Sequence, residues 1–200
     1  YLLGLLYHLN SASEVIRGIK LIESHIIRQR FTNTVTGSDL NELYAEICRD
    51  AFTREDPIRY IQSQLISYAP SDDELEAAII GNDFPRNQRT LFLLERLESD
   101  QFRGSDELQV SSGEIEHIIP RKAYSAKKYN GWVDYLNCGK SKFNENKDKL
   151  GNLTILEQRL NIEASDRPFE QKKAKYRASD YIMSNEVSNY REWSIKIVEE

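Results

Sequence analysis

Cysteine is nearly absent from this chain, which has Cys48 and Cys138 and no others. Two cysteines so far apart provide neither a disulfide framework nor the C-x-x-C pair of a zinc knuckle. We therefore expect two plain thiols in a reducing cytosol, in a fold that depends on neither disulfides nor structural zinc.

Long apolar runs are also missing, and no stretch approaches the roughly 18 consecutive apolar residues that a membrane-spanning helix needs. We expect no membrane partner. The opening YLLGLLY is short, has no basic residues before it and does not begin with Met. This pattern favours an internal helix of a longer chain over a signal peptide.

Positive charge is not in excess, because 27 Lys and Arg are outnumbered by 32 Asp and Glu, for a formal net charge of -5. The distribution is uneven, however. Residues 1–110 hold 11 Lys and Arg against 18 Asp and Glu, whereas residues 121–177 hold 14 against 7. The basic segment favours contact with nucleic acid, although a solvated lysine-rich surface produces the same pattern.

The first hundred residues have the apolar spacing of amphipathic helices. We predict three helices from their apolar stripes, a fourth that begins after Ser71 and a buried one over residues 90–97. The polar break at residues 102–105 predicts a boundary between a helical segment, residues 1–104, and a second domain, residues 105–200. The stripes are Val15, Ile19, Ile22 and Ile26; Leu40, Leu43, Ile47 and Ala51; and Ile58, Ile61, Leu65 and Tyr68.

The second domain has a different texture, with short strands and irregular segments. Residues 108–110 and 113–119 have the pattern of strands, and Pro120 ends the second of them. A long basic loop over 121–150, with a short helix at 132–136, precedes a strand at 151–156 and a helix through Asn161. A basic helix over 169–178 and a last amphipathic helix through Val187, Tyr190, Trp193 and Ile197 follow. The expected fold class is α+β and mainly helical.

Glu116 and His117 stand at the end of a predicted strand, ahead of the basic loop. Phosphodiester hydrolysis needs an activated water, a cation for the developing charge and positive groups for the backbone. A neutral histidine accepts a proton from water, and a carboxylate and an amide oxygen hold a hard cation such as Mg²⁺. His8 and His25 have no partner at ligand spacing and are expected to be packing or surface residues.

The ordered set EHIIPR, LGNLTIL and Asn161 resembles the HNH signature of ββα-metal (His-Me finger) nucleases. Together with PFEQKKAKY, it resembles more narrowly the C-terminal nuclease domain of GmrSD-type modification-dependent restriction endonucleases. These motifs cover about residues 114–177, and a weaker similarity extends over the helical part. The resemblance implies an HNH endonuclease with a ββα-metal core, a long basic loop and C-terminal helices.

Residue roles follow from the resemblance where positions match. His117 aligns with the general base, Asn152 with the structural asparagine and Asn161 with a metal ligand, whereas Glu116 occupies the place of the carboxylate ligand. A regular strand would turn Glu116 and His117 to opposite faces. The resemblance therefore requires a local twist or bulge, and the other interpretation of Glu116 is a surface partner of Lys or Arg.

Phosphate contacts are expected from Arg121, Lys172 and Lys173. The cofactor expected is a divalent metal, Mg²⁺, for which Mn²⁺ can substitute. One such site cuts one strand, so DNA nicking that leaves 5′-phosphate and 3′-hydroxyl ends is the elementary event.

By family analogy, the full-length bacterial protein acts in the cytoplasm against modified phage DNA and carries an N-terminal nucleotide-hydrolysing domain. The chain itself has no G-x-x-x-x-G-K-[ST] loop. Two alternatives stay open: a non-catalytic nucleic-acid-binding module with a decayed HNH fold, and a nuclease that acts on RNA.

Overall fold

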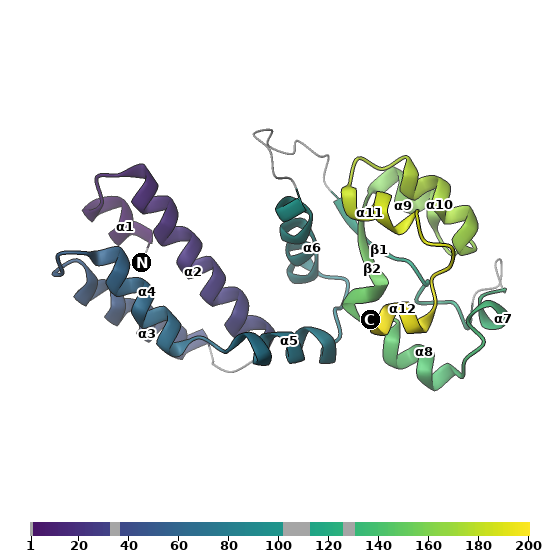
Figure 1. Cartoon of the computed structure of the whole chain (residues 1–200), viewed down its shortest axis with the longest axis horizontal. Coiled ribbons are helices and arrows are strands. Elements are labelled where there is room, and N and C mark those ends of the chain that lie inside the picture. Colours follow the sequence, from purple (N-terminus) through teal and green to yellow (C-terminus); the bar gives the residue numbers. More distant parts are fainter. Residues whose placement is uncertain (1, 33–36, 102–112, 126–130) are drawn as a thin grey trace. The chain divides into compact units, whose positions relative to one another are not determined.

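The structure of the chain, a computed structural model, describes residues 2–32, 37–101, 113–125 and 131–200 (Figure 1). The described residues divide into two units, residues 1–81 and 82–200. The boundary that the sequence predicts at 104–105 and the strand that it predicts at 108–110 both lie outside the described residues. Helix α6, predicted as part of the first segment, packs against the strands of the second unit.

The described elements of the first unit are all helices, as the apolar spacing predicts. Each predicted stripe lies on a helix, but three of the stripe residues are exposed: Ile19 and Ile26 on α2 and Tyr68 on α4. Ser71 and Glu74 form a reciprocal capping pair ahead of α5. The helices are α1 (Leu2–His8), α2 (Ala12–Thr32), α3 (Gly37–Ala51), α4 (Pro57–Tyr68) and α5 (Asp72–Gly81).

The second unit contains one two-stranded antiparallel sheet. Strand β1 (Gly113–His117) pairs with β2 (Leu153–Glu157), with Ile115 opposite Ile155 and His117 opposite Leu153. Helix α9 (Gln158–Ala164) follows β2 directly and packs against both strands. In Figure 1, α9 and α10 lie together on one side of the strands. The chain is therefore mainly helical with a small sheet, in agreement with the predicted α+β class.

The other helices of this unit correct the sequence analysis in two places. Residues 140–146 of the predicted loop form a helix that buries Phe143 and Asn146. The sequence did not predict this helix because the segment has no apolar stripe. The predicted last helix is wrong, since Trp193 lies between two short helices and Tyr190 is exposed. The remaining elements are α6 (Gln88–Gln101), α7 (Trp132–Leu136), α8 (Lys140–Asn146), the 3-10 turn η1 (Leu150–Asn152), α10 (Phe169–Arg177), α11 (Ile182–Val187) and α12 (Ile195–Glu199).

An apolar cluster joins helices α7 to α12 to the residues that follow β1. Ile118 and Ile119, which follow the strand, are enclosed in it, and this burial fixes the direction in which the chain leaves His117. The cluster comprises Ile118, Ile119, Ala123, Trp132, Leu136, Phe143, Leu156, Leu160, Ala164, Phe169, Tyr176, Val187, Trp193, Ile195 and Val198.

Among the described residues, no helix combines the length and the apolar character needed to cross a membrane.

Gly151 in η1 lies against the backbone of Val198 in α12. A methyl group on Gly151 would lie 2.4 Å from the backbone oxygen of Val198, so Gly151→Ala must displace one of the two elements. We expect a loss of about 2 kcal/mol in the free energy of unfolding, measured by urea denaturation. Gly139→Ala is the matched control, because a methyl group there meets nothing within 4 Å. An equal loss in both variants would contradict this account of the packing.

Candidate active site

His117 is the last residue of β1, and its imidazole is largely buried. The ring Nε2 lies 3.1 Å from the Asp148 carboxylate, which also binds Arg121 Nε at 3.0 Å. Burial lowers the pKa of His117 to about 4; the hydrogen bond and charge of Asp148 oppose this, and the charges of Arg121 and Lys172 add to it. The imidazole is therefore neutral at cellular pH, which is the form that accepts a proton.

The contact with Asp148 decides which ring nitrogen of His117 is available as a base. A carboxylate only accepts hydrogen bonds, so Nε2 carries the hydrogen and Nδ1 carries the free lone pair. In the described residues that are not exposed, every enclosed side-chain nitrogen or oxygen except Trp193 Nε1 has a hydrogen-bond partner. Nδ1 of His117 has no such partner and does not belong to the enclosed atoms. It is therefore open to solvent and can meet a water molecule.

Glu116 is held from behind by helix α10. Its Oε1 accepts hydrogen bonds from Lys172 Nζ at 2.7 Å and from the Tyr176 hydroxyl at 3.0 Å. Burial raises the pKa of Glu116, whereas the charge and hydrogen bond of Lys172 and the Tyr176 hydroxyl oppose the rise. The same reasoning as for His117 applies to the second oxygen, Oε2, which has no partner among the described residues and is not enclosed.

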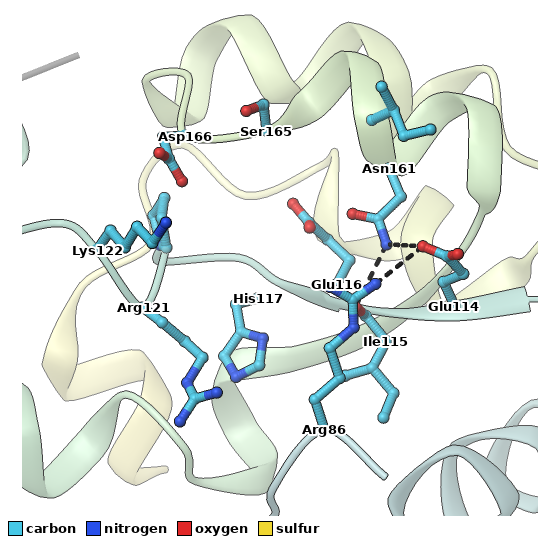
Figure 2. Close-up of a pocket in the computed structure, with 12 residues that line it drawn as sticks. Arg86, Glu114, Ile115, Glu116, His117, Arg121, Lys122, Asn161, Ser165 and Asp166 are labelled. Carbon is cyan, nitrogen blue, oxygen red and sulfur yellow. Dashed lines mark hydrogen bonds and ion pairs between the residues drawn. The ribbon is translucent and has the colours of Figure 1, made fainter. Parts of the chain in front are cut away.

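Glu116 and His117 point to opposite sides of β1, as strand geometry requires (Figure 2). The Glu116 carboxylate lies on the side of α9, together with Glu114 and Asn161. Asn161 Nδ2 donates to Glu114 Oε2 at 3.1 Å and to the Ile115 carbonyl at 3.3 Å. The Asn161 amide oxygen therefore faces the pocket, on the side of the Glu116 carboxylate (Figure 2).

Asn152 is fully buried in η1 and supports the end of β1. Its Oδ1 accepts from the Ile119 N–H at 2.8 Å, and its Nδ2 donates to the carbonyls of Ile119 and Lys147 at 2.9 and 2.8 Å. All its side-chain hydrogen bonds go to backbone groups, which is the geometry of a brace rather than of a reacting group.

Glu116, His117 and Asn161 line an open pocket of about 500 Å³, whereas Asn152 does not. Arg121 is half exposed on its rim, where its guanidinium can reach a bound anion. The pocket brings together Glu116, His117, Arg121 and Asn161 of the residues that the sequence singled out, and neither Lys172 nor Lys173 lines it. Its walls are formed by Arg86, Glu114, Ile115, Glu116, His117, Pro120, Arg121, Lys122, Asn161, Ile162, Ser165 and Asp166.

The two neighbouring lysines of α10 have different surroundings. Lys172 is 0% exposed, and its ammonium donates to Glu116 and to the carbonyls of His117 and Ile118. Lys173 is largely buried, with its ammonium 3.4 Å from the exposed Glu170. A lysine whose three donors are all engaged inside the protein holds its partners in place, because no donor is left for a ligand.

The donor atoms of the pocket fit a hard cation. No group of three or more His, Cys, Asp or Glu side chains in the described part of the chain could share a metal ion. Glu116 Oε2 and Asn161 Oδ1 nevertheless face the same pocket without partners. Carboxylate and amide oxygens suit Mg²⁺, which usually takes few protein ligands and keeps several waters.

Sequence reasoning missed three residues of this site: Asp148, Glu114 and Arg86. Asp148 had a weak signal, as one of two acidic residues in an otherwise basic stretch, residues 138–150. Glu114 stands two positions before Glu116 and so shares its strand face. Arg86, which pairs with Glu114 at 2.9 Å, comes from the segment before α6 and carried no signal.

A family model described as GmrSD restriction endonucleases, C-terminal domain, matches residues 69–200 of the chain. No curated protein and no solved structure matches it.

We expect substitutions of the two neighbouring lysines of α10 to lower the free energy of unfolding by very different amounts. Lys172→Met leaves the buried Glu116 without its counter-charge, and we expect a loss of about 3 kcal/mol in the free energy of unfolding. Lys173→Met removes the same charge from the same helix but breaks only a pair with an exposed carboxylate, so the expected loss is below about 1 kcal/mol. Urea denaturation measures both. A loss for Lys173→Met as large as that for Lys172→Met would contradict the assigned roles.

Proposed function

The chain belongs to the family of GmrSD restriction endonuclease C-terminal domains, and we propose that it is an HNH-type, metal-dependent endonuclease that nicks DNA. Family membership supports nuclease activity on DNA. The observation that carries the finer proposal is the convergence on one pocket of three atoms without partners: His117 Nδ1, Glu116 Oε2 and Asn161 Oδ1.

His117 acts as the general base in this proposal. Its Nδ1 takes a proton from a water molecule while the water oxygen forms a bond to the scissile phosphorus. The bond from phosphorus to the 3′ oxygen breaks, and the leaving oxygen gains a proton from solvent. The products are a 5′-phosphate and a 3′-hydroxyl.

Glu116 and Asn161 would hold the divalent cation, Mg²⁺ or in its place Mn²⁺, that offsets the charge on the leaving oxygen. Arg121, with Arg86 and Lys122 on the same pocket, contacts the phosphates of the strand being cut. Lys172 and Tyr176 keep the Glu116 carboxylate turned toward the pocket, and Asn152 holds the end of the strand that carries His117.

The biological role proposed is that of the effector part of a restriction protein that defends bacteria against phage with modified DNA. In the full-length protein, an N-terminal nucleotide-hydrolysing domain would recognise that DNA. Both statements rest on the family alone.

His117→Ala is expected to lower the rate of plasmid nicking by at least about 100-fold, because a general base contributes roughly 10²- to 10⁴-fold. DNA affinity, measured by fluorescence anisotropy, should stay close to that of the wild type, since Arg121 and its neighbours are intact. His8→Ala, on an exposed residue of the first unit, is the matched control. Wild-type nicking by the His117→Ala protein would refute the assignment of the base.

Removal of divalent metal with EDTA should abolish nicking, and Mg²⁺ or Mn²⁺ should restore it.

We expect Asn161→Ala and Glu116→Gln to weaken Mn²⁺ binding by at least about tenfold, because each removes one of few protein ligands. Electron paramagnetic resonance measures the Mn²⁺ affinity. Asn144→Ala, on an exposed asparagine, is the control. Unchanged Mn²⁺ affinity in Asn161→Ala would remove Asn161 as a ligand. DNA binding with no metal-dependent nicking by the wild type would favour the non-catalytic module instead.

A further inference from the structure

Asp148 lies on the connection between α8 and η1, far in sequence from His117, yet it is the partner of the His117 imidazole. Its carboxylate is only 14% exposed and bridges His117 Nε2 and the Arg121 guanidinium. Among the described residues, no other carboxylate contacts the His117 ring. A charged group this enclosed is costly unless it is paired, and Arg121 supplies the pair.

The backbone around Asp148 is fixed on both sides. The carbonyl of the preceding Lys147 accepts a hydrogen bond from Asn152 Nδ2 at 2.8 Å. The carbonyl of Asp148 itself accepts one from the Phe84 N–H at 2.7 Å. Asn152 also binds Ile119, two residues after His117. One side chain therefore sets the position of both the strand end and the carboxylate.

We propose that Asp148 is a positioning residue for the nuclease reaction, an inference that rests on the function proposed above. By accepting the hydrogen of Nε2, it selects the imidazole tautomer whose Nδ1 lone pair faces the pocket. It also holds the ring plane in place, and it stabilises the imidazolium after Nδ1 has taken the proton from water. The opposite tautomer would present an N–H to the water and could not accept its proton.

The first test needs no catalysis and uses the wild-type chain. Nitrogen chemical shifts of ¹⁵N-histidine-labelled protein at neutral pH distinguish a protonated from an unprotonated ring nitrogen, and His117→Ala assigns the signal. We expect His117 with hydrogen on Nε2 and none on Nδ1. A His117 with hydrogen on Nδ1 overturns the proposal, whatever the nuclease activity of the chain.

The second test is kinetic and uses two substitutions of the same chemistry. Asp148→Asn keeps the size of the side chain, but its amide can accept from or donate to Nε2, so both tautomers become populated. We expect kcat for nicking to fall by about 100-fold, with KM for DNA changed by less than about threefold. Asp83→Asn is the control, because exposed Asp83 pairs with Lys149 in the same unit and does not contact His117.

The outcomes separate the two proposals. A wild-type kcat in Asp148→Asn, with His117→Ala inactive, overturns the role of Asp148 and leaves the nuclease function standing. A fall in kcat shared equally by Asp83→Asn also overturns it, because the effect would then be one of net charge. Wild-type nicking by His117→Ala rejects the proposed base itself.

Discussion

The site depends on a backbone constraint at the end of β1. Beyond His117 the strand has no further ladder partner, yet Ile118 and Ile119 continue into the apolar core, where unpaired N–H and C=O groups are costly. The Asn152 backbone carbonyl accepts from Ile118, and its side-chain amide pairs with both polar groups of Ile119. An asparagine can make this double pairing because its amide has the donor and acceptor of a peptide group.

Alternation along the strand explains why the pocket wraps around an edge instead of lying on one face. Glu116 is turned toward α9 and α10, and His117 toward the segment that carries Asp148. Strand β1 keeps a regular register through Glu116 and His117, so these two side chains point to opposite sides without a bulge. In the mechanism proposed above, the base His117 and the metal-binding Glu116 on opposite sides of one strand end would reach two sides of the same phosphodiester, as in-line displacement requires.

The sequence predicted the helical stripes of the first unit, α7, α9 and α10. It also predicted β1 and β2, from short apolar runs next to turn residues and not from alternating burial. It did not predict α8, because one buried aromatic residue gives no stripe, and it joined α11 and α12 because Trp193 has helical spacing but sits in the connection. For the site, the sequence predicted Glu116, His117, Asn152 and Asn161 through their motifs. It missed Asp148, Glu114 and Arg86, which lie outside those motifs. Nothing in the phrase QKK distinguishes the enclosed Lys172 from Lys173, and Asp148 gains its meaning only when η1 brings the loop back to β1.

The contact of Gly151 with the backbone of Val198 sets an order of events during synthesis on the ribosome. Gly151 precedes Asn152 in η1, and α12 packs against both η1 and α8. Val198 lies far after η1 in the sequence, so η1 lacks this packing partner until Val198 has been added. During synthesis, the chain therefore carries the residues of the proposed site before it carries the part of α12 that packs against η1.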